Sequence, residues 1–219
     1  YNNCFIKEWP QDKFLKFSNK LNNILPAFDQ DKLIPIREKV HKKLRIAFFS
    51  SDLRKKHSVS FFLKTVLSSY DKNKFEIYLY LNHRSFKDDD TTSLFKGLVD
   101  KSFNTAELNN IDLINLIRGH QLNILIDLMG ITSGSRLEII KNRVAPIQIS
   151  WCGYCNTTGI KEMDYMITDS NLIQKKEMNL YQEKIIFMPN IWNTHSGFDL
   201  ERTFNEAPVL KNKTFTFGS

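Results

Sequence analysis

His57 is the residue in this sequence best suited to acid–base chemistry. It lies in the stretch DLRKKHSVS at residues 52–60, between an apolar run that predicts a strand over residues 44–51 and a helical pattern over residues 58–70. An imidazole changes its charge near neutral pH, so a histidine in this position could take a proton from a bound ligand. The same context is typical of a histidine that caps a helix or lies on the surface, and both interpretations stay open here.

Two cysteines separated by Gly153 and Tyr154 are the second candidate for chemistry. The segment WCGYC at residues 151–155 is similar to the redox motif of thioredoxins and follows a predicted strand. A thioredoxin pair opens a long helix whose N-terminus lowers the thiol pKa, whereas NTTG at residues 156–159 predicts a turn. We therefore expect Cys152 and Cys155 to be free thiols on a loop, whose replacement by serine leaves folding nearly intact; a thiol oxidoreductase is a remote alternative.

The sequence shows neither metal-ligand spacing nor a phosphate-binding loop. His41, His83, His120 and His195 have no partners at such spacing, so no metal site is expected. No GxGxxG or Walker pattern follows the first predicted strand, and the chain has 8 glycines in total. A cradle for nucleotide phosphates is therefore not expected within these residues.

Composition places the chain among ordinary globular proteins. Its 219 residues include 31 Lys+Arg and 24 Asp+Glu, a net charge of +7, with 42% hydrophobic residues; these values exclude wholesale disorder, collagen and a long coiled coil. The densest basic run, KVHKKLR at 39–45, has no interleaved aromatics, so no nucleic-acid partner is expected. No apolar run of about 18 residues and no leader is visible, which predicts no membrane partner. The 3 cysteines, an odd number, favour a reducing, cytoplasmic location.

Alternating strands and helices must position these groups. Strands are predicted over residues 44–51, 75–81, 123–129, 146–151, 164–168 and 185–188. Helices are predicted over residues 58–70, 92–99, 111–120 and 133–142. This alternation is typical of βαβ units, so the fold class is α/β with a mainly parallel sheet. Ligands of such sheets bind at the carboxyl ends of the strands, here the loops 50–58, 130–135 and 151–160.

Residues 1–43 differ from the rest of the chain. Apolar residues at helical spacing between Asp12 and Leu25 predict one amphipathic helix, which Pro26 ends. One helix cannot bury its apolar face alone. We therefore expect it to pack on the domain that starts near Leu44 or on a unit upstream.

Five segments, in order, match a known family. They are LRIAFFSSDL (44–53), HSVSFF (57–62), ILIDLMGIT (124–132), RVAPIQISWCGYCNTTG (143–159) and MDYMITD (163–169). On these motifs the chain resembles the first half of the catalytic region of O-linked N-acetylglucosamine transferases and the related SPINDLY proteins. It departs from the family in three places: Asp52 and His57 are five residues apart instead of four, Ile131 replaces a His or Tyr, and Cys155 replaces a Pro.

The resemblance implies a fold and a division of the chain. Residues 44–219 would form a Rossmann-like lobe with a mainly parallel sheet, the N-terminal lobe of a GT-B glycosyltransferase, ending before the second lobe. Residues 1–43 would be a helical linker that follows tetratricopeptide repeats. The second lobe of the family binds the diphosphate of the donor, which fits the missing phosphate loop.

The resemblance also implies a function. Members transfer a sugar from a nucleotide sugar to Ser or Thr hydroxyls of proteins, with inversion and without a metal or cofactor. The expected partners are the donor, UDP-GlcNAc, and protein acceptors. By motif position, His57 would be catalytic, and nine residues would bind substrate: Gly130, Thr132, Trp151, Cys152, Gly153, Tyr154, Thr157, Thr158 and Gly159. Alternatives within the family are a protein O-fucosyltransferase that uses GDP-fucose and an inactive, repeat-linked binding scaffold.

Overall fold

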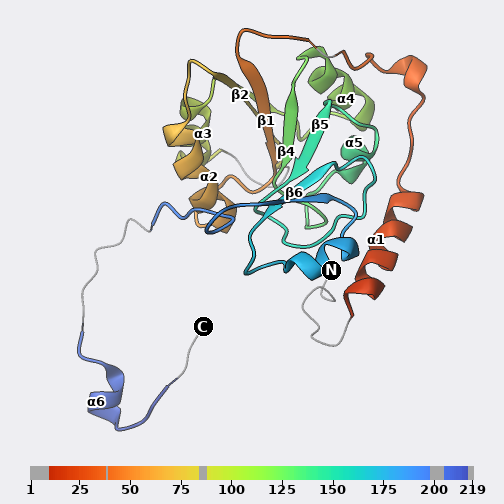
Figure 1. Ribbon diagram of the computed structural model, residues 1–219. Coiled ribbons are helices and arrows are strands. Elements are labelled where there is room, and N and C mark those ends of the chain that lie inside the picture. The colour runs from red at the N-terminus through yellow and green to blue at the C-terminus, as the bar shows by residue number, and fades with distance from the viewer. Residues whose placement is uncertain (1–9, 38, 84–87, 198–204, 217–219) are drawn as a thin grey trace.

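The computed structural model describes residues 10–37, 39–83, 88–197 and 205–216 (Figure 1). The strands are β1 (Leu44–Ser50), β2 (Phe75–Leu81), β3 (Lys101–Asn104), β4 (Ile124–Asp127), β5 (Ile147–Ser150), β6 (Tyr165–Thr168) and β7 (Lys184–Phe187). The helices are α1 (Gln11–Ile24), α2 (Ser58–Ser69), α3 (Asp90–Leu98), α4 (Asn110–Gly119), α5 (Leu137–Lys141) and α6 (Pro208–Asn212), with the 3₁₀ segments η2 (Gln30–Lys32) and η3 (Lys175–Leu180).

The seven strands form one parallel sheet in the order β3-β2-β1-β4-β5-β6-β7. Every pairing along this order is parallel, from Leu44 opposite Phe75 to Thr168 opposite Phe187. The expectation of a Rossmann-like α/β fold is therefore confirmed. The direction in which strands are added reverses between β1 and β4, and in such sheets the reversal opens a crevice at the carboxyl ends of the strands.

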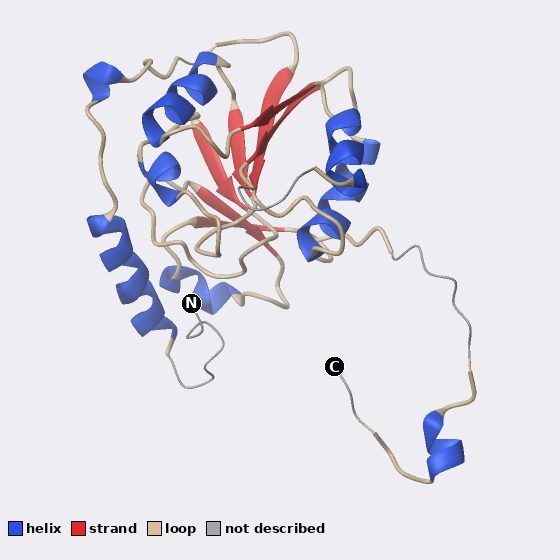
Figure 2. Cartoon of the chain, turned by 180° about the vertical axis from the view of Figure 1, so that it is seen from behind, coloured by secondary structure: helices blue, strands red, loops and turns tan. Residues whose placement is uncertain are grey.

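Two apolar clusters cover the two faces of the sheet because successive strand residues point to opposite sides. Tyr78 and Tyr80 of β2 pack with α4 and α5 in one cluster. Ile77 and Leu79, from the same strand, pack with α2 and α3 in the other. Figure 2 shows the sheet between these two helix layers, with α1 lying outside them.

The structure corrects two of the predicted elements. Residues 101–104 form the short edge strand β3, which the sequence analysis did not predict. The helix expected over residues 133–142 is reduced to α5, Leu137–Lys141, because the preceding segment turns at Gly134 with φ 82°. A left-handed glycine is typical of a turn rather than of a helix interior.

Three residues of the matching segments 143–159 and 163–169 stabilise the amino ends of β5 and β6. Both terminal nitrogens of Arg143 donate to the carboxylate of Asp164, at 2.9 and 2.8 Å. The buried amide of Gln148 donates to the carbonyls of Ile140 and Glu162 at 3.0 and 2.7 Å. Such bidentate and buried bonds fix geometry. These side chains precede or open their strands, so they lie at the end of the sheet away from its carboxyl edge.

Helix α1 packs on the α/β domain. Leu21 and Leu25 pack against the cluster on the α4 and α5 face, and Asn22 accepts hydrogen bonds from Lys141 Nζ and Lys161 N at 3.1 and 3.4 Å. The division of the chain after residue 43 stays a prediction, and residues 1–9 and 38 of the first part lie outside the described residues. Among the described residues, no helix has the length and apolar character needed to cross a membrane.

Candidate functional site

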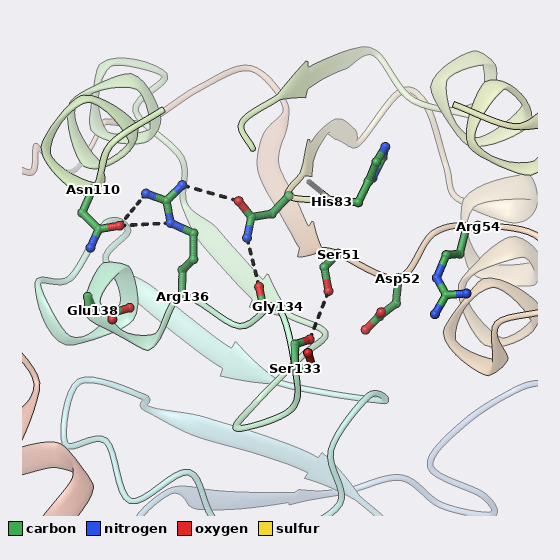
Figure 3. Close-up of a pocket in the computed structure, with 10 residues that line it drawn as sticks. Ser51, Asp52, Arg54, His83, Asn110, Ser133, Gly134, Arg136 and Glu138 are labelled. Atoms are coloured by element: carbon green, nitrogen blue, oxygen red, sulfur yellow. Dashed lines mark hydrogen bonds between the residues drawn. The ribbon is translucent and has the colours of Figure 1, made fainter. Parts of the chain in front are cut away.

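A polar cavity of about 490 Å³ lies at the carboxyl edge of the sheet, where β1, β2 and β4 end (Figure 3). The lining residues come from the loops after these strands and from the starts of α4 and α5. They are Ser51, Asp52, Arg54, Asn82, His83, Asn110, Ser133, Gly134, Arg136 and Glu138. The cavity therefore lies at the crevice that the sheet order predicts.

Hydrogen bonds fix one wall of this cavity. Arg136, 8% exposed, donates from Nε to Asn110 Oδ1 at 3.0 Å and also bonds this oxygen from Nη2 (Figure 3). Asn82 donates to the carbonyl of Gly134 at 3.0 Å, and its own side-chain oxygen lies 3.4 Å from Arg136 Nη1. The loops after β2 and β4 are thereby tied together, so this wall is preorganised.

His57 lies beside the cavity, next to Asp52. Its Nε2 atom lies 3.5 Å from Asp52 Oδ1, and its Nδ1 atom accepts a hydrogen bond from Val59 N at 3.4 Å, which caps α2. The turn before it closes with Lys56 at φ 63°. The structure thus gives His57 the capping role that the sequence allowed, and it also places a carboxylate beside the ring.

The surroundings of His57 favour the neutral form of its imidazole. Burial lowers the pKa of His57 below its ordinary 6.5, and the positive charge of Arg54 lowers it further. The carboxylate of Asp52 acts in the opposite direction because it stabilises the imidazolium. A neutral imidazole beside a carboxylate can accept a proton and then be stabilised in its charged form.

The loop after β4 is built on the buried carboxyl of Asp127. Gly130 N donates to Asp127 Oδ2 at 2.7 Å, and Thr132 Oγ1 donates to the carbonyl of Met129 at 2.7 Å. Burial raises the pKa of Asp127 to about 7, and the bonds from Gly130 and Met129 oppose this shift. Gly130 has φ 56°, a conformation that favours glycine.

The loop after β5 fits closely against the loop after β4. A Cβ atom on Gly130 would lie 2.5 Å from the Cβ of Tyr154, and one on Gly153 would lie 1.7 Å from the carbonyl oxygen of Leu128. Both distances are shorter than any van der Waals contact. The structure therefore brings together the predicted residues Gly130, Gly153 and Tyr154, and glycine is required at both positions.

Trp151 and the two cysteines have different surroundings. Trp151 turns to the α2 and α3 face, where its indole donates to the carbonyl of Trp192 at 2.7 Å. Cys155 is an exposed thiol outside any disulfide, as expected. Cys152 is likewise outside any disulfide but only 5% exposed, within the apolar cluster of that face. The expectation that both cysteines lie open on a loop is therefore wrong for Cys152, because its backbone at φ 76° carries the side chain inward.

Thr157, Thr158 and Gly159 are buried, away from the lining of the cavity. Both threonines bond the carboxylate of Glu183, and Gly159 contacts Ser18 of α1. The sequence analysis did not single out Glu183, Asp127 or Arg136. Asp127 had a detectable signal, since it ends a buried strand three residues before Gly130 of the quoted motif. Among the described residues, no group of three His, Cys, Asp or Glu side chains could hold a metal ion.

The parallel sheet, the crevice at β1 and β4 and the His57–Asp52 pair define an α/β lobe of the kind that binds ligands at its carboxyl edge. A profile of glycosyl transferase family 41 matches residues 27–214, and the chain therefore belongs to that family. This confirms the resemblance drawn from the sequence motifs.

Individual relatives agree with this assignment. The chain is 30% identical over 179 residues to a UDP-N-acetylglucosamine–peptide N-acetylglucosaminyltransferase of Caenorhabditis elegans, covering 80% of this chain and 15% of that protein. It is 30% identical over 182 residues to a probable transferase of this name, SPINDLY, from Petunia hybrida, covering 81% and 19%.

A solved structure agrees with the fold. A mutant O-GlcNAc transferase from Thermobaculum terrenum superposes with a TM-score of 0.75 at 26% identity, covering 85% of this chain and 36% of that one. The expected GT-B type of lobe is thereby confirmed. The chain spans less than a fifth of the length of the two curated relatives and about a third of the solved one.

Proposed function

We propose that the chain is part of a protein O-glycosyltransferase that transfers GlcNAc from UDP-GlcNAc to Ser or Thr hydroxyls of proteins. The observation that carries this proposal is the His57–Asp52 pair beside the cavity at the sheet reversal, in a chain of glycosyl transferase family 41. The names of the relatives favour this donor and a protein acceptor.

Under this proposal, His57 acts as the general base. The acceptor oxygen attacks the anomeric carbon from the side opposite the diphosphate, the bond from that carbon to the diphosphate breaks, and the hydroxyl proton goes to His57. The lone pair of Nδ1 makes only a 3.4 Å contact with Val59 N, so the acceptor hydroxyl has a weak competitor for it. Asp52 then stabilises the imidazolium. The step needs no metal and inverts the configuration at the anomeric carbon.

The nine predicted substrate-binding residues differ in how close they lie to the cavity, and this proposal gives them different roles. Gly130 and Thr132 belong to the loop after β4, whose residues Ser133 and Gly134 line the cavity, and Gly153 and Tyr154 lie against that loop. Trp151, Cys152, Thr157, Thr158 and Gly159 are buried, and none of the nine predicted residues lines the cavity itself, so in this proposal these five hold the loop after β5 in place and do not touch substrate.

The cysteine pair favours the transferase over a thiol oxidoreductase. Burial raises the pKa of Cys152 to about 12, so the thiol stays protonated at neutral pH. Disulfide exchange needs a thiolate, which redox sites stabilise by lowering the thiol pKa. The surroundings of Cys152 act in the opposite direction.

The proposal is tested with the protein expressed from the full coding sequence, a peptide library containing Ser and Thr, and either UDP-GlcNAc or GDP-fucose. Mass spectrometry in the presence of EDTA should find GlcNAc on hydroxyl residues. Transfer from GDP-fucose alone would indicate the O-fucosyltransferase alternative. Transfer from neither donor, with the protein folded, would indicate the inactive scaffold and overturn the proposal.

A further inference from the structure

Glu183 is a buried carboxylate that the function proposed above does not use. It directly precedes β7 and is 3% exposed. Oε2 accepts a hydrogen bond from Thr157 Oγ1 at 2.7 Å, and Oε1 accepts one from Thr158 N at 2.7 Å and another from the Thr158 hydroxyl. The two carboxylate oxygens are therefore hydrogen-bonded to two consecutive residues of the loop after β5, Oε2 to Thr157 and Oε1 to Thr158.

The two threonine hydroxyls are in turn hydrogen-bonded to backbone amides of neighbouring residues. Thr157 Oγ1 accepts hydrogen bonds from Gly159 N and Gln182 N, both at 3.1 Å. Thr158 Oγ1 lies 3.3 Å from Ile160 N. Because each hydroxyl proton goes to Glu183, the oxygen lone pairs remain for these amides. Removing the carboxylate would leave buried donors without an acceptor, which is costly.

The same loop lies against the loop after β4, whose residues Ser133 and Gly134 line the cavity. Residues 151–159 run from Gly153 and Tyr154, which contact the loop after β4, to Gly159, which contacts α1. A Cβ atom on Gly159 would lie 2.3 Å from the Cβ of Ser18. The loop is thus held at both ends by close contact, and Glu183 holds it between these two contacts, at Thr157 and Thr158.

We propose that Glu183 is a positioning residue: its carboxylate sets the conformation of residues 151–159 and thereby holds Tyr154 against Gly130, in the loop after β4 that lines the site. The structural part of this inference is independent of the reaction. Its catalytic part rests on the proposed function, and the two parts are measured separately.

The conformation of the loop can be read from its own cysteines. Cys152 is buried and Cys155 is exposed within the same loop. The alkylation rate of Cys152 divided by that of Cys155 therefore reports opening of the loop, with Cys155 as the internal reference. In the protein from the full coding sequence, treated with N-ethylmaleimide and mapped by mass spectrometry, Glu183→Gln should raise this ratio at least tenfold. Amide exchange in β1 should stay within threefold. The exposed Glu107→Gln is the matched control and should leave the ratio within twofold.

Substitutions at Thr157 test the same bonds from the other side. Thr157→Val removes the hydroxyl but keeps the shape of the side chain, and it should raise the ratio as Glu183→Gln does. Thr157→Ser keeps the hydroxyl and should restore the wild-type ratio. These variants also cover the case in which Glu183→Gln does not fold. An unchanged ratio in Thr157→Val, or a rise matched by equally faster exchange in β1, would overturn the positioning role.

The catalytic part is tested by the split between kcat and KM. Glu183→Gln and Thr157→Val should lower kcat at least tenfold with KM for UDP-GlcNAc within threefold of wild type, and the control Glu107→Gln should retain activity. A more open loop with an unchanged kcat would overturn the catalytic part alone. If the wild-type protein transfers no sugar, the proposed function fails, while the alkylation result still decides the structural part.

Discussion

The Oδ1 atom of Asp52 lies 3.5 Å from Nε2 of His57, across the turn that joins β1 to α2. Both side chains are largely shielded from solvent, with 15% and 26% exposed, so the pair is screened less than a surface pair. The carboxylate of Asp52 can therefore stabilise the protonated form of His57, beside the crevice where the order of the strands reverses. It also makes the titration of His57 depend on Asp52.

Replacing Asp52 by Asn should lower the pKa of His57 further. Burial already lowers this pKa below 6.5, and the carboxylate of Asp52 is the group that opposes the shift. The pKa is measured by NMR titration of the His57 ring in the wild type and in Asp52→Asn. An equal or higher pKa in the variant would show that the carboxylate does not stabilise the imidazolium.

Asp127 should make the protein less stable as pH rises from about 4 to about 7. Its pKa is raised from 3.8 to about 7 in the folded state, so the carboxyl ionises first in the unfolded chain. The contribution of Asp127 to the free energy of unfolding is fully present below about pH 4 and is lost by about pH 7. At about 1.4 kcal/mol per pKa unit, the upper limit of this contribution is about 4 kcal/mol.

Asp127→Asn removes this titration and keeps an oxygen for Gly130 N. Urea unfolding between pH 4 and 8 should therefore show that the wild type loses more stability than the variant over this range. Parallel curves for the two proteins would mean that the carboxyl of Asp127 titrates alike in the folded and unfolded states.

Gly153→Ala should be strongly destabilising. The new Cβ would lie 1.7 Å from the carbonyl oxygen of Leu128, and both groups are backbone-bound, so a shift of the two loops is needed. We expect a loss of about 3 kcal/mol or more in the free energy of unfolding. The control is Gly97→Ala in α3, where a Cβ meets no atom within 4 Å and should stabilise by about 0.5–1 kcal/mol. Equal effects of the two substitutions would contradict the close contact of the loops.

The two cysteines should respond differently to serine. Cys152→Ser buries a hydroxyl in an apolar cluster and should cost about 1–3 kcal/mol, whereas the exposed Cys155→Ser should stay within about 0.5 kcal/mol. Thermal and urea unfolding of the single variants separate the two. If both substitutions are equally mild, Cys152 is not part of the core.

The central sheet could be predicted because its strands carry their own signal. The residues 75–81 are apolar nearly throughout, as a strand buried on both faces must be, and they form β2 with the predicted bounds. The edge strand β3, KSFN, has Phe103 as its one apolar residue. Its strand conformation comes from pairing with β2, which lies about twenty residues earlier, and no local pattern shows it.

The site was predictable in part for a similar reason. His57, Gly130 and Gly153 lie in loops directly after apolar strands, so the sheet rule points to them. Glu183 binds Thr157 and Thr158, which lie 25 or 26 residues away in the sequence, and Arg136 binds Asn110 from another helix. These contacts depend on the tertiary fold. The burial of Cys152 likewise depends on a left-handed backbone conformation that its sequence does not indicate.

The most direct test of the account is the rate of sugar transfer by His57→Ala in the protein from the full coding sequence. If His57 takes the acceptor proton, kcat should fall by about 10²–10⁴, while the affinity for UDP-GlcNAc changes little. His41→Ala, a histidine that precedes the amino end of β1, is the control and should retain wild-type activity. A kcat for His57→Ala within threefold of the wild type would contradict the account and leave His57 as a helix cap alone.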